Sequence, residues 1–204
     1  MMRVLYMNQG GGGNHGAIDY ASYDLILLAE RDDNPYPQVF DEAFVSNDSA
    51  PAMSVWKKKG LGRALTESTD IDHTKSSTRP LVHTQATRTI AGMFVHIIFV
   101  HLKSASATRA KAEMEVIIPV LRKLVGLGHQ VLLIGDMNRL SQDLLATEGM
   151  VPILLGGGHA KWDLDHAWAN EALATYIGAQ AKVDIAATAA LDHGHIAISI
   201  DFCP

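Results

Sequence analysis

Short apolar stretches of five to ten residues, several of them ending on a polar residue, dominate the pattern along the chain. Continuous or alternating apolar positions over such lengths are typical of strands that are buried on one or both faces. The pattern predicts strands at residues 3–8, 25–30, 52–58, 81–87, 93–102, 130–134, 164–169 and 196–202.

One longer segment has the period of a helix. Its apolar residues recur at steps of three and four: Ala110, Met114, Ile117, Ile118, Leu121 and Val125. This spacing predicts an amphipathic helix over residues 108–125. Pro119 lies inside it and has no backbone N–H to donate, so we expect a kink there or a break into two helices. A short helix is expected between Ser141 and Gly149.

The order of the expected elements favours a mixed sheet. Strand, helix and strand follow each other once, around the helix at 108–125, whereas elsewhere strands follow strands directly. A doubly wound fold would alternate strands and helices regularly. Residues 31–51 and 60–79 are polar and are interpreted as long loops. We therefore expect a single α/β domain, residues 1–204, built as a mixed-sheet sandwich.

Composition and charge narrow the class of protein. The formal net charge is −5, so no global basic field attracts nucleic acid. This charge still permits an enzyme with a local basic patch and a bound cation. Cys203 is the only cysteine, and we see no signal peptide and no apolar run long enough to span a membrane. We expect a cytoplasmic monomer without a membrane span.

The glycine-rich stretch after the first strand raises the possibility of a dinucleotide-binding loop. Gly11, Gly13 and Gly16 fit the spacing G-x-G-x-x-G. The segment between Gly16 and the strand at 25–30 is too short for the crossover helix of such a unit, however. We interpret the glycines as a turn that brings the backbone close to Asn8 without side chains in the way.

Polar residues with acid–base or metal-binding chemistry stand at the ends of several predicted strands. They are Asn8, Glu30, His101, Asp136, Asn138, Asp165, Asp192 and His193. Hard oxygen ligands of this kind suit Mg²⁺, which keeps several waters and takes one or two carboxylates plus a substrate phosphate. A bound cation and a carboxylate near a water molecule are what cleavage of a phosphodiester needs.

Six segments in order resemble the motifs of the DNase I-like endonuclease/exonuclease/phosphatase superfamily. They are "MN" before the glycines, "LILLAER", "VHIIFVHLKS", "VLLIGDMN", "LDHAWAN" and "LDHGHIAISIDF". The segment "GDMNR" is also similar to the nuclease subunit of cytolethal distending toxins. The resemblance implies a four-layer αββα sandwich: two mixed sheets face to face, with helices outside.

The resemblance also implies metal-dependent cleavage of a phosphoester, with Mg²⁺ as the cofactor and Mn²⁺ as a substitute. Asn8 and Glu30 would hold the metal, and Asp192 would lie beside it. Asp136 would orient or deprotonate the attacking water, and Asn138 would fix the phosphate or Asp136.

Two histidines complete the implied site. His193 would hydrogen-bond the scissile phosphate, and Asp165 would hold its imidazole. His101 would face the phosphate or the leaving oxygen. Which histidine acts as the acid is left open. Arg109 and Arg139 each follow a catalytic strand end by a few residues and are candidate contacts to the substrate phosphates.

Some positions depart from the pattern of the superfamily. Met7, Ala29 and Leu191 stand where its members usually have Trp, Gln and Ser. We expect a DNA-cleaving nuclease. The alternatives are a phosphatase or phosphodiesterase that acts on a lipid or small phosphoester, and a non-catalytic binding module. Endo- or exo-action, and DNA or RNA as the substrate, are left open.

Overall fold

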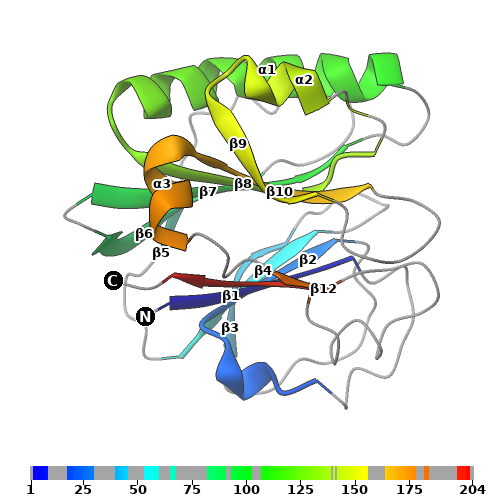
Figure 1. Cartoon of the computed structure of the whole chain (residues 1–204). Coiled ribbons are helices and arrows are strands. Elements are labelled where there is room, and N and C mark those ends of the chain that lie inside the picture. Colours follow the sequence, from blue (N-terminus) through cyan, green and yellow to red (C-terminus); the bar gives the residue numbers. More distant parts are fainter. Residues whose placement is uncertain are drawn as a thin grey trace.

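The computed structural model places two six-stranded sheets face to face, with the long helix on the outside (Figure 1). The structure describes residues 2–8, 18–29, 40–45, 53–59, 65–67, 82–90, 93–102, 107–138, 140, 142–155, 164–177, 182–183 and 197–202.

The first sheet has the strand order β11-β12-β1-β2-β4-β3. The strands are β1 (Met2–Asn8), β2 (Leu25–Ala29), β3 (Phe40–Val45), β4 (Ser54–Lys58), β11 (Lys182–Val183) and β12 (Ala197–Phe202). Strands β1 and β2 are parallel and all other neighbours are antiparallel. Met2 pairs with Phe202, so both ends of the chain lie at one end of the sandwich, and Asn8 lies at the other.

The second sheet has the order β5-β6-β7-β8-β10-β9. Its strands are β5 (Leu65–Glu67), β6 (Val82–Ile90), β7 (Met93–His101), β8 (Gln130–Asp136), β9 (Met150–Leu155) and β10 (Asp165–Asn170). Here too one central pair, β7 and β8, is parallel and the rest is antiparallel. Both sheets are therefore mixed, as the sequence predicts.

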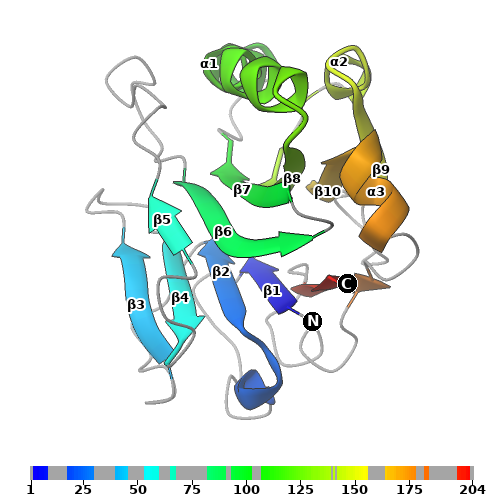
Figure 2. The same ribbon diagram turned by 90° about the vertical axis from the view of Figure 1, so that its left-hand side faces the viewer.

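Helix α1 (Ala107–Gly126) connects the parallel strands β7 and β8 across the outer face of the second sheet (Figure 2). Its buried stripe contains Ala110, Met114, Ile117 and Leu121, which confirms the predicted amphipathic face. Pro119 lies within this single helix on its exposed side. The predicted break into two helices is therefore wrong, since the helix continues through Pro119; a kink stays a prediction.

Two short helices and a 3-10 turn complete the layers. Helix α2 (Gln142–Ala146) confirms the predicted short helix, and α3 (Glu171–Ile177) follows β10 directly. On the outer face of the first sheet, the turn η2 (Tyr20–Ser22) packs through Tyr20.

Alternation along the strands assigns the described side chains to three clusters, one between the sheets and one on the outer face of each sheet. One face of each sheet contributes to the core between the sheets, for example Tyr6, Leu27, Phe99 and Ile134. Residues of the opposite parity in the second sheet pack under α1. This alternation follows from the two-residue period of a strand. Polar residues that continue the inner rows, at the strand ends, therefore point into the space between the sheets.

All eight predicted strands are present, with ends shifted by up to three residues. The two predicted loops are wrong in part, because β3 lies within 31–51 and β5 within 60–79. Strand β3 is an edge strand with Asp41 and Glu42 inside it, and charged residues on an edge hide the apolar pattern of a strand. No helix among the described residues is long and apolar enough to cross a membrane.

Candidate active site

Three neighbouring strands of the second sheet bring polar side chains into one row. His101 on β7 pairs with Asp136 on β8, and Asp136 pairs with Asp165 on β10. Each of them continues the row of side chains that its strand turns toward the first sheet. His101 lies two residues after Phe99, Asp136 two residues after Ile134, and Asp165 two residues before Ala167. All three are buried, with exposed fractions of 2–6%. The row therefore faces the first sheet at the end of the sandwich opposite the termini.

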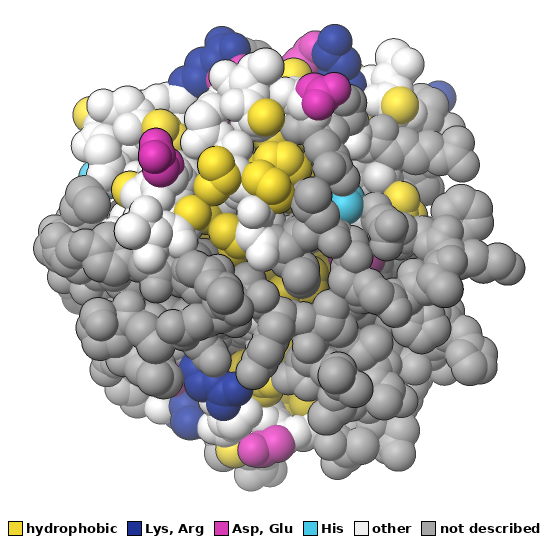
Figure 3. Space-filling model, in the orientation of Figure 1, with side chains coloured by type: hydrophobic (Ala, Val, Ile, Leu, Met, Phe, Trp, Pro, Cys, Tyr) yellow, Lys and Arg dark blue, Asp and Glu magenta, His cyan; other side chains and the backbone are white. Residues whose placement is uncertain are grey.

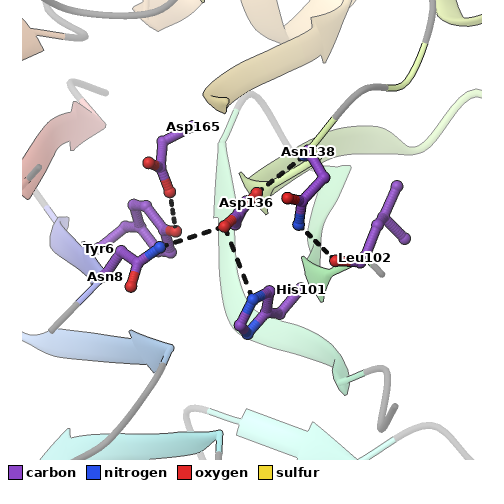
Figure 4. Close-up of polar contacts among 7 residues, drawn as sticks. All are labelled: Tyr6, Asn8, His101, Leu102, Asp136, Asn138 and Asp165. Atoms are coloured by element: carbon purple, nitrogen blue, oxygen red, sulfur yellow. Dashed lines mark hydrogen bonds and ion pairs between the residues drawn. The ribbon is translucent and has the colours of Figure 1, made fainter. Parts of the chain in front are cut away.

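Asp136 is the centre of a polar network (Figure 4). Its Oδ1 accepts the backbone N–H of Asn138 at 2.8 Å. Its Oδ2 accepts Nδ2 of Asn8 at 3.2 Å and lies 3.6 Å from Nε2 of His101. A donor from the first sheet and one from its own turn thus hold this carboxylate in one orientation, with the His101 imidazole beside it.

Asn138 has a backbone conformation that suits few residues. Its φ is 49°, in the left-handed region, which Asn tolerates better than most residues because its side chain is short and polar. Its Nδ2 donates to the carbonyl oxygen of Leu102, directly after β7. The backbone N–H of Leu102 in turn donates to the carbonyl of Asp136 at 2.8 Å. The ends of β7 and β8 are thereby tied together.

Asn8 on β1 reaches the polar network of Asp136 from the first sheet. Its side chain is 4% exposed and reaches Asp136 across the gap between the sheets (Figure 4). Its carbonyl oxygen Oδ1 is buried, and none of the described residues donates a hydrogen bond to it. Buried amide oxygens normally accept a hydrogen bond or bind a cation. Oδ1 of Asn8 is therefore a hard oxygen donor that fits the predicted Mg²⁺.

A further contact between the sheets involves a residue that the sequence analysis missed. The hydroxyl of Tyr6 on β1 donates to Oδ1 of Asp165 (Figure 4). Tyr6 is fully buried, and its ring meets Phe99 edge to face with 5.8 Å between the centroids. Tyr6 lies two residues before Asn8 on the same strand, and residues i and i+2 share a face. This spacing alone could have indicated that Tyr6 points toward the site.

Arg109 lies in the first turn of α1 and is exposed. Because α1 is the crossover between parallel strands, it begins at the end of the sheet where β7 ends. Arg109 is thus on the outside of the second sheet, at the same end of the molecule as Asp136. The other predicted site residues fall outside the described residues: Glu30, Arg139, Asp192 and His193.

The arrangement joins two carboxylates, an imidazole and two amide side chains at one buried edge. A carboxylate held in a fixed orientation can align a water molecule and accept its proton. Imidazole and amide N–H groups can donate to phosphate oxygens as charge develops there. Within the described part of the chain, no three His, Cys, Asp or Glu side chains are grouped as a metal site; the metal ligands implied by the resemblance include Glu30 and Asp192.

Comparison with known proteins is informative at the level of structure. No known family model and no curated protein sequence matches the chain. An AP endonuclease from Archaeoglobus fulgidus superposes with a TM-score of 0.70 at 12% identity, covering 100% of both chains. The endonuclease domain of TRAS1, a telomere-specific non-LTR retrotransposon, gives 0.69 at 13% identity over 98% of both chains.

Those matches decide the architecture. The chain has the DNase I-like fold. A third structure with this fold, the 3′ phosphatase NExo from Neisseria bound to a product DNA hairpin, matches with a TM-score of 0.69 at 12% identity over 100% of both chains. The prediction of a DNase I-like αββα sandwich of two mixed sheets is thereby confirmed. The similarity to the cytolethal distending toxin nuclease stays a prediction.

Proposed function

We propose that this chain is a Mg²⁺-dependent phosphodiesterase that cleaves DNA. The observation that carries the proposal is the buried Asp136 carboxylate, which Asn8 and the Asn138 backbone hold between the two sheets, beside the imidazole of His101. Three proteins with the same fold are described as endonucleases or as a DNA 3′ phosphatase, which supports phosphoester hydrolysis as the reaction and DNA as the substrate.

In this proposal, Asp136 aligns the attacking water and takes its proton as the water oxygen bonds to phosphorus and the bond from phosphorus to the leaving oxygen breaks. The Nδ2 of Asn8 and the backbone N–H of Asn138 keep the carboxylate oriented throughout. His101, 3.6 Å from Asp136, donates to a phosphate oxygen or to the leaving oxygen. Fixed donors of this kind need no reorganisation as negative charge develops.

The proposed metal would be held by Asn8 and Glu30, with Asp192 beside it. The buried Oδ1 of Asn8, to which none of the described residues donates, supports the fit, and Mn²⁺ has the same preference for oxygen ligands. When bound, the cation would neutralise charge on the transferring phosphoryl group. Glu30, Asp192 and the second histidine, His193, enter the proposal through the resemblance of their motifs.

The test is nicking of a supercoiled plasmid by the purified protein with Mg²⁺ and with EDTA. We expect cleavage with Mg²⁺ only, and a loss of at least about 100-fold in the Asp136→Ala variant, because general-base catalysis contributes about 10²–10⁴-fold. The His193→Ala variant should lose activity to a similar degree. The matched control is Asp143→Asn, which alters an exposed carboxyl group on α2 and should retain full activity.

Different outcomes separate the alternatives. Wild-type protein that hydrolyses phospholipids or small phosphoesters, but not DNA, would support the lipid or small-phosphoester enzyme instead. Wild-type protein that is inactive on every phosphoester, yet binds DNA, would support the non-catalytic module. Cleavage that persists in EDTA would contradict the metal requirement. A cytoplasmic location and a monomeric state stay predictions. Size-exclusion chromatography tests the monomeric state.

A further inference from the structure

Strand β1 contacts both carboxylates of the polar row. From one face of this strand, the side chain of Asn8 donates to Asp136 and that of Tyr6 donates to Asp165. Two residues along a strand are separated by about 7 Å. The two aspartates are direct neighbours across the β8–β10 pair. One strand of the first sheet therefore supplies a separate donor to each of two adjacent aspartates of the second sheet.

The two aspartates need separate donors because they face each other. Side chains directly opposite in an antiparallel pair have Cβ atoms about 4.5–5.5 Å apart, and like charges there repel. Asp136 has donors on both of its oxygens. Oδ1 of Asp165 accepts from Tyr6, and that hydrogen bond directs the carboxylate toward β1 (Figure 4).

The donor itself is held rigidly. Tyr6 lies in the middle of β1, between Leu27 of β2 and Ile198 of β12. Its fully buried ring packs edge to face on Phe99. A phenol has only two side-chain torsions, and here the core fixes both. The hydroxyl is thus a stationary group at the boundary between the apolar core and the polar row.

We propose that Tyr6 is a positioning residue of the active site, whose hydroxyl fixes the carboxylate of Asp165 in its working orientation. The inference rests on the proposed function and on the role that the resemblance implies for Asp165, which is to hold the imidazole of His193 at the phosphate. Tyr6 touches neither substrate nor metal and acts only through Asp165. The role belongs to the hydroxyl, while the ring is part of the core.

The first test compares Tyr6→Phe with wild type in steady-state DNA cleavage. The ring and its packing remain, so only the donor is lost. We expect kcat to fall about 10- to 100-fold, as when the outer hydrogen-bond partner of a metal ligand is removed, with KM changed less than about 2-fold. Tyr20→Phe is the matched control, because it removes another buried tyrosine hydroxyl on the opposite face of the first sheet, and its kcat should equal that of wild type.

The second test is a double-mutant cycle with Asp165→Ala. If Tyr6 acts only through Asp165, adding Tyr6→Phe to that variant leaves kcat unchanged within about 2-fold. If Tyr6 only stabilised the core, the losses of kcat in the two single variants would multiply in the double variant, or Tyr6→Phe would change the melting temperature alone. Either result overturns the inference. Asp165→Leu, which has a similar volume and no acceptor for the Tyr6 hydroxyl, serves in the same way should Asp165→Ala fail to fold.

A third readout is independent of turnover. Crystal structures of wild type and Tyr6→Phe should show the Asp165 carboxylate in two different orientations, with the backbone of β10 unchanged. An Asp165 side chain that keeps its place without the hydroxyl overturns the inference, whatever the protein cleaves. Failure of the proposed function would instead appear as wild-type protein that is inactive on DNA while Asp165 still moves in the variant.

Discussion

At the scale of single residues, two backbone conformations on either side of Asp136 restrict what the chain can place there. Gly135 has φ 145°, and a Cβ atom at this position would overlap with the carbonyl oxygen of Val100. Asn138 has φ 49° and uses its amide to tie β8 to β7. The "GDMN" motif therefore has a structural reason: the glycine lets β8 approach β7, and the asparagine turns the chain back.

Gly135→Ala should be severely destabilising. The overlap is with backbone, which cannot move without separating β7 from β8. We expect a drop in melting temperature of more than about 10 °C, or no folding, measured by circular dichroism. Gly128→Ala is the control: it also has a positive φ, 76°, but an open surrounding, and should lose only about 2–6 °C. Equal losses in both variants would contradict this explanation.

At the scale of elements, the period of the apolar residues predicted those strands and helices that bury a regular face. Strands β1, β7 and β8 and helix α1 belong to this group. Strands β3 and β9 and helix α3 do not. Strand β3 lies at an edge and carries Asp41 and Glu42, and α3 is short. Strand β9 is apolar throughout, but it lies at an edge and contains Pro152, which interrupts the pattern of a strand. Tertiary pairing, rather than local sequence, decides that such segments become regular.

One ion pair joins helix α1 to the turn after α2, on the outer side of the second sheet. Two of the guanidinium nitrogens of Arg122 on α1, Nε and Nη2, each donate to one carboxylate oxygen of Glu148, after α2, at 2.6 Å. This hydrogen bonding lowers the pKa of Glu148 below its ordinary value of 4.5. A carboxyl group whose pKa is lowered by folding stabilises the fold above its unfolded-state pKa, and the effect is lost as the pH falls through the folded-state pKa.

Arg122→Gln should therefore change stability in a pH-dependent way. At pH 7 we expect a melting temperature about 1–2 °C below wild type, since the Arg122 side chain is 66% exposed and ion pairs open to solvent contribute little. In acid, once Glu148 is protonated in both states, the difference should vanish. Lys111→Gln, which removes another exposed positive charge from α1, should show no such trend. A difference that is constant from pH 7 to pH 3 would contradict the role of Glu148.

At the scale of the whole molecule, the candidate site exists because two mixed sheets meet at one end. Asn8 and Tyr6 come from the first sheet, and His101, Asp136 and Asp165 from the second. The net charge of −5 means that DNA would have to be bound by local positive groups. On the one face drawn in Figure 3, the charged side chains of the described residues are scattered and form no continuous basic stripe.

Arg109→Ala tests whether the site end of the molecule binds DNA. If Arg109 contacts a phosphate, the variant should have a higher KM for DNA and a slope of log KM against log salt that is smaller by about one. Lys111→Ala is the control, an exposed cation two residues further along α1, and should keep the wild-type slope. Equal behaviour of the two variants would contradict a specific role for Arg109.

The sequence by itself determined which polar residues end the strands, because hydrophobic periodicity is a local property and polar residues interrupt it visibly. Asn8, His101, Asp136, Asn138 and Asp165 follow from that pattern and from the order of the motifs. The tertiary structure alone decided which of these side chains meet. The contacts of Tyr6 with Asp165 and of Asn8 with Asp136 join residues more than a hundred positions apart. Such pairs depend on strand register and on how one sheet packs against the other, neither of which local periodicity encodes.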